Sequence, residues 1–233
     1  MPVSSFGVAT SYVRLEYDQR QFNFAHRVAD ILGVADLQAL GRDSRLSLRI
    51  RENDQKTSWH ATFYEHFARE LGALYRTFVA RVAALYYSES FYFQDVPTLR
   101  VHLPDNRAVG EFHTDLIYGH PDGERSFWVP LTPAFATNTV LIESAPGAKD
   151  YVAAEANPGE VIVFDSGHLE HGNVVNETGV ARVSFDFRGL PVAEYRPNQR
   201  TSINTNRAFA PGHYYAAEPM AGRRDVDATT PAR

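Results

Sequence analysis

Apolar residues recur every three or four positions over residues 59–85, the spacing that places side chains on one face of an α-helix. The series is Trp59, Phe63, Phe67, Leu71, Leu74, Phe78, Val82 and Leu85. It predicts one long amphipathic helix, capped at its start by Thr57 or Ser58. A weaker pattern over residues 22–40 predicts one or two shorter helices. We therefore expect residues 1–90 to be mainly helical.

The pattern changes after Phe91 to short runs of β-branched and aromatic residues, separated by turn signals such as Asn157-Pro158-Gly159. Strands are predicted over residues 98–103, 110–117, 126–130, 139–143, 161–164 and 181–188. Strands at such short intervals are typical of a sandwich or barrel made of two antiparallel sheets. The fold class expected is α+β with a mainly β core.

We expect one domain, with a helical buttress over residues 1–90, a β core over 91–190 and a C-terminal segment over 191–233. The C-terminal segment is polar from Pro197 onward and contains a small aromatic cluster around Tyr214. Two interpretations fit this segment. It packs over the mouth of the barrel as a lid, or it wraps the outside of the barrel and becomes disordered after residue 220.

Composition narrows the possible partners. The chain has 233 residues and is 44% hydrophobic, which is enough for one large domain with a sizeable core. Its net charge of −5 is not gathered in a run of either sign, so we expect neither nucleic acid nor a membrane as partner. No apolar stretch approaches a membrane span, and residues 1–10 lack the pattern of a signal peptide. We expect a soluble cytoplasmic protein, a monomer or homodimer, that acts on a small polar metabolite.

Two residues that lie two positions apart, His113 and Asp115, are candidate metal ligands. On a strand both side chains would share one face, while Thr114 would point away. The chain has no cysteine, so histidines and carboxylates are the metal ligands available. Two histidines and one carboxylate leave three positions of a metal open, as in non-heme Fe(II) enzymes. The pair therefore predicts an iron site that needs one more histidine.

For the third ligand we choose His171 over His168. Gly172 would let the backbone approach the site closely, and the distance in sequence to Arg182 suits a neighbouring strand across an intervening turn. His168 is then a substrate-facing residue or a loop histidine. His120 follows the first pair closely and is expected beyond the metal, near the substrate.

Arg182 and Ser184 alternate onto one face of a predicted strand, and the opposite face is apolar. A guanidinium offers two parallel N–H groups to a carboxylate, and a serine hydroxyl adds a third donor. This pair would bind the distal carboxylate of a 2-oxo diacid whose other end chelates the iron. The alternative is that Arg182 pairs with Asp186 or Glu160.

Further polar residues are candidates for binding substrate or co-substrate. Asp186 and Arg188 continue the face of Arg182, and Arg100 and His102 lie on the strand before the triad. The alternative is mutual pairing, such as Asp186 with Arg100, because a buried unpaired charge is costly. Asn138 and Thr139, at the start of a predicted strand, would hydrogen-bond the co-substrate. For Asn138, capping a turn is nearly as good an explanation.

These motifs resemble the Fe(II)/2-oxoglutarate-dependent oxygenase superfamily, whose members share His-x-Asp, a distal histidine and a following Arg-x-Ser. The resemblance covers residues 98–188. It implies a double-stranded β-helix (jelly-roll, cupin-like) with an N-terminal helical buttress, with Fe(II) as cofactor and 2-oxoglutarate and O2 as co-substrates. More narrowly, the segments are similar to small bacterial oxygenases of natural-product clusters, including aminoglycoside-type pathways. The segments are 111–120, 128–132, 171–173 and 182–188.

The resemblance also bears on the reaction. Related halogenases replace the carboxylate at the position of Asp115 with a small residue, so its presence favours hydroxylation of a small polar metabolite. Desaturation, epimerisation and ring formation begin with the same oxidation step as hydroxylation, so they remain alternatives to it. Two other functions remain as alternatives: a cupin-like metal-binding isomerase, hydrolase or sensor without an oxo acid, and a binding module with a vestigial site.

Overall fold

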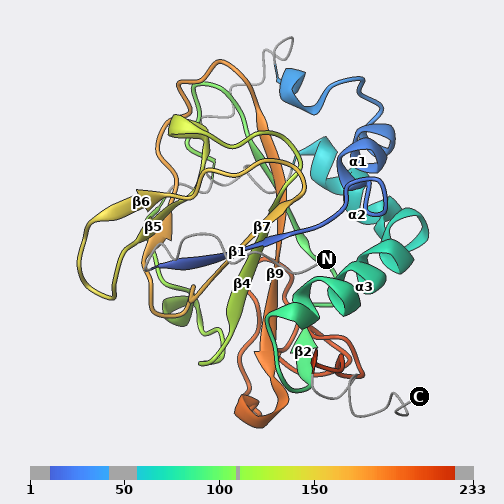
Figure 1. The fold of residues 1–233 in the computed structure, drawn as a ribbon, viewed down its shortest axis with the longest axis vertical. Helices are drawn as coiled ribbons and strands as arrows, with labels where there is room; N and C mark the ends of the chain where they lie inside the picture. Colours follow the sequence, from blue (N-terminus) through green and yellow to red (C-terminus); the bar gives the residue numbers. More distant parts are fainter. Residues whose placement is uncertain (1–10, 42–56, 109–110, 224–233) are drawn as a thin grey trace, which may run out of the picture.

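The structure is a computed structural model that describes residues 11–41, 57–108 and 111–223 (Figure 1). Its core is two antiparallel sheets. The larger contains β1 (Tyr12–Glu16), β2 (Phe91–Phe93), β3 (Thr98–His102), β4 (Arg125–Pro130), β7 (Glu160–Phe164) and β9 (Arg182–Pro191). The smaller contains β5 (Leu141–Glu143), β6 (Tyr151–Ala153) and β8 (His171–Gly172). The mainly β core predicted from the sequence is confirmed.

Three α-helices pack on one side of the larger sheet (Figure 1). They are α1 (Phe24–Leu32), α2 (Ser58–Glu70) and α3 (Gly72–Arg81). Short 3-10 helices complete the described elements: η1 (Leu37–Ala39), η3 (Ala83–Leu85), η4 (Asp115–Tyr118), η5 (Ala136–Asn138) and η6 (Val192–Glu194). No helix in the described parts of the chain is long and apolar enough to cross a membrane.

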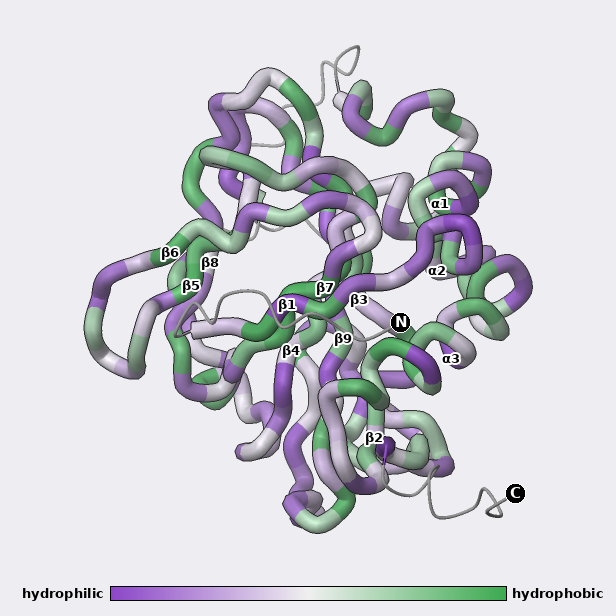
Figure 2. Tube along the Cα trace, viewed as in Figure 1, coloured by the Kyte–Doolittle hydropathy of each residue, from purple (hydrophilic) through white to green (hydrophobic). Residues whose placement is uncertain are grey.

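The ten-residue strand β9 organises the larger sheet, because it pairs with β2, β3 and β4. Hydrophilic and hydrophobic residues alternate along it (Figure 2). Val183, Phe185 and Phe187 face the helices and pack in the main core, where the Phe185 ring lies 5.1 Å from that of Phe24. The opposite, polar face of β9 looks toward the smaller sheet. The space between the two sheets is lined by a second apolar cluster that includes Trp128.

The single long helix predicted over residues 59–85 is wrong in one respect, because it is broken between α2 and α3. Leu71 departs from helical geometry, with φ −122° and ψ −22°, and is buried to 2% exposure in the core. The next residue is Gly72, which favours a helix poorly. The apolar spacing continues across the break because both helices pack on the same core. At the start of α2, Thr57 is the N-cap residue, but its hydroxyl contacts His60 rather than a backbone N–H.

The predicted strand over residues 110–117 is also wrong. His113 forms only an isolated bridge with His171, and the chain then turns into η4, which begins at Asp115. Gly119 ends this turn with a positive φ of 84°, and its N–H bonds back to Asp115. Residues 109 and 110 lie outside the described parts of the chain.

The sequence missed four short strands, β1, β2, β6 and β8. In β1 only Leu15 is buried, so the alternation that marks a half-buried strand is weak. The strands β2 and β6 have three residues each and β8 has two, which is too short for a periodic signal. β8 and β9 belong to different sheets, so the expectation that His171 and Arg182 lie on paired neighbouring strands is wrong.

The C-terminal segment combines features of both interpretations of it. It packs on β2 through an apolar cluster of Leu190, Phe209, Tyr214 and Tyr215. It also reaches the cavity between the sheets, where it contributes Ile203 and Asn204 to the lining. The prediction of disorder near the C-terminus falls largely on residues 224–233, which lie outside the described parts of the chain.

His60 makes stability depend on pH. Burial, together with the charge of Arg100, lowers the pKa of His60 to about 4. As the pH falls from 7 to 5, the unfolded chain therefore binds a proton at His60 while the folded chain does not, and the free energy of unfolding decreases. We expect His60→Gln to make this decrease shallower in urea unfolding at several pH values. The matched control is exposed His26→Gln, and equal slopes in the wild type and His60→Gln would contradict the prediction.

Candidate active site

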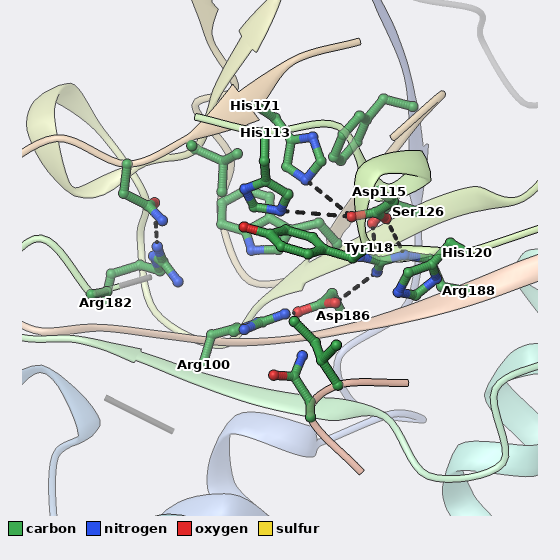
Figure 3. Close-up of a pocket in the computed structure, with 18 residues that line it drawn as sticks. Arg100, His113, Asp115, Tyr118, His120, Ser126, His171, Arg182, Asp186 and Arg188 are labelled. Carbon is green, nitrogen blue, oxygen red and sulfur yellow. Dashed lines mark hydrogen bonds and ion pairs between the residues drawn. The ribbon is translucent and has the colours of Figure 1, made fainter. Parts of the chain in front are cut away.

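His113, Asp115 and His171 meet at one point of the cavity between the sheets (Figure 3). One potential ligand atom from each lies within 4.8 Å of the others. The Nε2 atoms of both histidines lie 3.7 Å from Oδ1 of Asp115. These distances leave room for one ion among the three atoms, so the structure brings together the three residues chosen as metal ligands.

Backbone hydrogen bonds hold this arrangement. The N–H of each histidine donates to the carbonyl of the other, at 3.0 Å and 2.9 Å, and the N–H of Asp115 donates to the carbonyl of Ser166 at 2.8 Å. A Cβ added at Gly172 would lie 3.1 Å from the Cα of Phe112. The glycine therefore permits a close approach of the two chain segments, as predicted from the sequence.

The two histidines are oriented as metal ligands. Nδ1 of His113 lies 2.7 Å from the carbonyl of Glu111, and Nδ1 of His171 lies 3.0 Å from that of Leu169. Each Nδ1 therefore carries the proton and donates, which leaves the lone pair of Nε2 for a metal. Burial lowers the pKa of His113, and it lowers that of His171 to about 4. Both rings are neutral near pH 7, as ligation requires.

The second oxygen of Asp115 is held by Arg188, whose Nε lies 2.7 Å from Oδ2 (Figure 3). Arg188 also donates to Asp186 at 2.7 Å and to Ser126 at 3.0 Å, and Asp186 accepts from Arg100 at 2.7 Å. Burial alone would raise the pKa of Asp115, but the charge of Arg188 and its hydrogen bond hold that pKa well below its ordinary value. Asp115 is thus an ionised carboxylate with Oδ1 directed at the histidines. Two imidazole nitrogens and one carboxylate oxygen fit a divalent iron.

Arg182 lies across the same cavity from Asp115 (Figure 3) and is only 1% exposed. Its nitrogens donate to the Asn138 carbonyl at 2.9 Å, the Ser184 hydroxyl at 3.0 Å and the Asn173 side chain at 2.9 Å. Its guanidinium stands 5.6 Å from the Trp128 ring. Burial and the charge of Arg100 lower the pKa of Arg182 to about 9, so it remains charged near pH 7.

No carboxylate of the described residues pairs with Arg182. The two acids considered as partners are engaged elsewhere: Asp186 with Arg100 and Arg188, and Glu160 with Arg14 at 2.5 Å. The pairing of Asp186 with Arg100, kept open as an alternative, is present. The positive charge of Arg182 is therefore buried without a compensating negative charge, a costly arrangement that an anionic ligand would relieve.

Five of the other predicted site residues do not line the cavity, and one of them is Ser184, which is fully buried beside Arg182. The Asn138 side chain accepts from the Phe135 N–H and donates to Thr178, which is the turn-capping alternative. The Thr139 hydroxyl donates to the Ala154 carbonyl at 2.6 Å. Their predicted contact with the co-substrate is therefore corrected, because these hydrogen bonds occupy both side chains.

His102 and His168 are corrected likewise. His102 is fully buried behind Arg182, and its Nδ1 lies 3.4 Å from the guanidinium. Burial and the charge of Arg182 lower its pKa to about 4, so a neutral ring accepts from the arginine. His168 is a loop histidine whose Nδ1 lies 3.1 Å from Asp165. Arg100, Asp186, Arg188 and His120 do line the cavity, and His120 Nδ1 lies 2.6 Å from Glu124.

The cavity has a volume of about 330 Å³ and includes residues that the sequence did not single out as site residues. Ser126 and Trp128 line it from β4, and Trp128 also donates to Ser184 at 3.0 Å. Their alternation with Phe127 and Val129 was a usable signal, because it places both on the polar face of the sheet. Ile203 and Asn204, from the C-terminal segment, had no periodic signal.

The chain resembles known proteins in sequence and in fold. No protein-family model matches the chain. Among curated proteins, the chain is 41% identical over 204 residues to the streptomycin biosynthesis protein StrG of Streptomyces griseus. The match covers 88% of this chain and 97% of StrG. Among solved structures, apo EctD from S. alaskensis has a TM-score of 0.51 and 22% identity, covering 91% of this chain and 82% of that chain. EctD with 2-oxoglutarate and 5-hydroxyectoine has a TM-score of 0.50 and 19% identity, covering 92% and 82%.

The chain therefore shares its fold with EctD, and its triad could hold a metal, as the resemblance in the sequence implied. By its sequence, the chain belongs to the same family as the streptomycin biosynthesis protein StrG.

Arg188 is expected to strengthen metal binding, because it fixes the carboxylate of Asp115 with Oδ1 directed at the histidines. We predict that Arg188→Gln weakens binding of Co(II) by about tenfold or more, as is typical when a group that orients a ligand is lost. The measurement is anaerobic titration with Co(II), followed by visible absorbance. The control is Arg76→Gln, which removes an exposed ion pair with Asp95. Unchanged affinity in Arg188→Gln would show that Asp115 holds its position without Arg188.

Proposed function

We propose that the protein is an Fe(II)- and 2-oxoglutarate-dependent oxygenase that hydroxylates a small polar metabolite in a natural-product pathway. The observation that carries this proposal is the buried, charged Arg182 without a carboxylate partner, on the cavity that also contains the triad. The name of StrG places that relative in streptomycin biosynthesis, which supports the pathway class. The fold is shared with EctD, whose structure with 2-oxoglutarate supports the co-substrate.

Iron would be held by Nε2 of His113, Nε2 of His171 and Oδ1 of Asp115. When bound, Fe(II), 2-oxoglutarate and O2 supply a two-electron oxidation of the substrate, with succinate and carbon dioxide as co-products. Asp115 occupies the coordination position that related halogenases leave open, which favours hydroxylation. The described residues supply three protein ligands, so room remains for a bidentate co-substrate and for oxygen.

Arg182 would bind the distal carboxylate of 2-oxoglutarate. A guanidinium has five N–H donors, and its contacts with Asn138, Ser184, Asn173 and His102 use four of them. One N–H remains for the carboxylate. The Ser184 hydroxyl accepts from both Trp128 and Arg182, so it would help to hold the guanidinium in place, while its direct contact with the carboxylate stays a prediction from the sequence. Arg182 would thus hold the distal carboxylate, and the triad on the same cavity would hold the metal.

The substrate would lie against the polar chain of Arg100, Asp186 and Arg188 and beside His120. His120 is fixed between Glu124 and the Phe209 ring, 4.6 Å away, so it presents a rigid edge to the cavity. Charged walls of this kind suit a hydrophilic substrate. The single-domain organisation, the cytoplasmic location and the monomeric or homodimeric state stay predictions from the sequence.

The proposal is tested by 2-oxoglutarate consumption with Fe(II) and oxygen over a panel of sugar- and amino-acid-derived metabolites. We expect substrate-dependent consumption that His113→Ala abolishes, because one of three ligands is lost. His168→Ala, a loop histidine outside the cavity, is the control and should retain activity. Absence of consumption over the whole panel, or equal and small effects of both variants, would contradict the proposal.

A separate prediction concerns Arg182. We expect Arg182→Ala to raise the 2-oxoglutarate concentration needed for half-maximal turnover by at least about thirtyfold, since losing one partner of a buried charge pair costs about 2 kcal/mol or more. The concentration needed by Arg182→Lys should lie between those of the wild type and Arg182→Ala, because lysine keeps the positive charge but lacks the planar guanidinium. Arg14→Ala, which removes the ion pair with Glu160, is the control. A requirement unchanged in Arg182→Ala would place the oxo acid elsewhere.

A further inference from the structure

A second cavity, of about 340 Å³, adjoins the metal cavity. Asn204 lines both. The two also meet along β3: Thr98 lines the second cavity, while its partner in register on β9, Asp186, lines the first. Arg100, two residues after Thr98 and so on the same face of β3, lines the first cavity. The cavities therefore lie next to one another along the polar face of β3.

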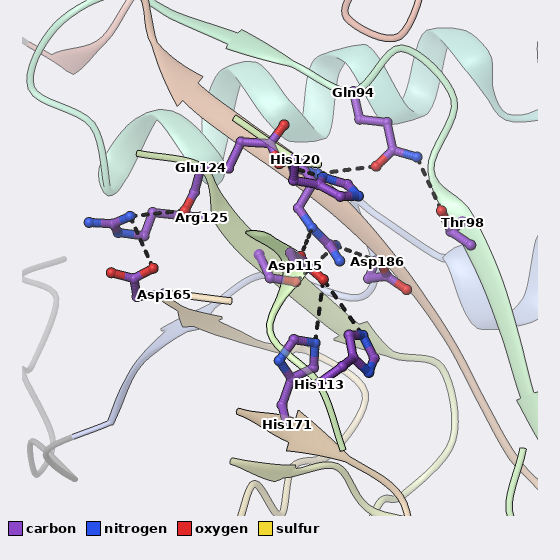
Figure 4. A network of polar contacts seen from close by, with 12 residues as sticks. Gln94, Thr98, His113, Asp115, His120, Glu124, Arg125, Asp165, His171 and Asp186 are labelled. Carbon is purple, nitrogen blue, oxygen red and sulfur yellow. Dashed lines mark hydrogen bonds and ion pairs between the residues drawn. The ribbon is translucent and has the colours of Figure 1, made fainter. Parts of the chain in front are cut away.

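Most of the described residues that line the second cavity carry a polar group on the side chain, and none of these lining residues is acidic. The side chains of Asn204 and Thr205 make no hydrogen bond within the described parts of the chain, so both are available to a ligand. Arg207 donates to the His213 carbonyl at 3.2 Å and keeps its other N–H groups. The Gln94 side chain donates to the Val96 carbonyl and the Thr98 hydroxyl, and it accepts from the Tyr214 hydroxyl and the Arg188 backbone N–H. Figure 4 shows its contact with Thr98. The wall behind is therefore fixed, and the free donors lie on the C-terminal segment.

Ile203 marks the boundary between the two cavities. It lines the metal cavity, next in sequence to Asn204, and yet it is 66% exposed. On the second cavity, Val96 and Pro97 offer a small apolar surface. Apolar patches beside hydrogen-bond donors suit the C–H faces and hydroxyl groups of a saturated ring.

We propose that the second cavity is a substrate subsite, which receives the second ring of a two-ring, hydroxyl-bearing substrate while the first ring lies at the metal. The ring in the subsite carries an anionic group, such as a phosphate or carboxylate, that Arg207 binds. The assignment of the reacting ring to the first cavity rests on the proposed function. The oxo acid occupies part of that cavity, so a two-ring substrate extends into the adjoining one.

The test uses metal-free protein and three sugars: trehalose 6-phosphate, which has two rings and an anion, neutral trehalose, and one-ring glucose 6-phosphate. Binding is measured by titration and by saturation-transfer NMR. We expect trehalose 6-phosphate to bind about tenfold tighter than either of the others, with saturation of both rings, because two linked contacts act together. Arg207→Gln should reduce its affinity to that of trehalose. Thr205→Trp, which fills the second cavity from its exposed edge, should weaken it at least about tenfold.

Val175→Trp, an exposed position outside both cavities, is the control for Thr205→Trp and should leave binding unchanged. The proposal is overturned if trehalose 6-phosphate binds no tighter than the other two sugars, which includes no binding at all. It is also overturned if Arg207→Gln and Thr205→Trp both leave its affinity unchanged. Because the test needs neither iron nor 2-oxoglutarate, its result is independent of the consumption assay, and either proposal can fail while the other holds.

Discussion

The buried positive charge of Arg182 is the constraint on which the rest of the site depends. Among the described residues, three arginines and two aspartates line the metal cavity, which leaves an excess of one positive charge on this lining. Arg100, Asp115, Asp186 and Arg188 neutralise one another through contacts of 2.7 Å, so the excess belongs to Arg182. Fe(II) and a 2-oxo diacid carry opposite charges of equal size, so binding both adds no net charge to the cavity. In the proposed function, the carboxylate would bind at Arg182 and the ion at Asp115, so the two would be held in different parts of the cavity.

The polar face of β9, which carries Arg182 and Arg188, is held in place because β9 is buried on both faces. Its apolar residues pack against the helices, where Phe185 and Phe187 contact the rings of Tyr75 and Phe78. The rigid packing on that side fixes the positions of Arg182 and Arg188 on the other. A residue inserted in β9 would exchange the two faces, placing charge in the aromatic core and phenyl rings in the cavity. The helical buttress therefore positions the site, although none of the described α-helices contributes a residue to the metal cavity.

The sequence predicted which side chains of the triad lie together better than it predicted the local structure of the chain there. His113 and Asp115 share a direction, as the spacing required, although the predicted strand ends at Asp115. The reason is that Thr114 remains extended, with φ −103° and ψ 148°, before η4 begins. Whether two residues of a motif point in the same direction thus depends on two or three backbone angles between them, whereas the length of a strand depends on partners elsewhere in the chain.

The remaining errors also have tertiary causes. Leu71 breaks the helix although the apolar spacing continues past it. Asn138 and Thr139 turn away from the cavity because Asn138 accepts from a backbone N–H of its own loop and Thr139 donates to a backbone carbonyl of the adjoining strand. The contribution of Ile203 and Asn204 to the cavity arises from how the C-terminal segment folds back. The pattern of residues along one segment gives no information on such long-range contacts.

The most direct test of the central claim is the visible absorption of the anaerobic protein with Fe(II), recorded before and after 2-oxoglutarate is added. The account predicts a metal-to-ligand charge-transfer band that appears with the oxo acid in the wild type and needs a much higher concentration in Arg182→Ala. A protein that binds iron but shows no band at any concentration of oxo acid would contradict it and favour the cupin-like alternative. Absence of iron binding would show that the triad is not a metal site.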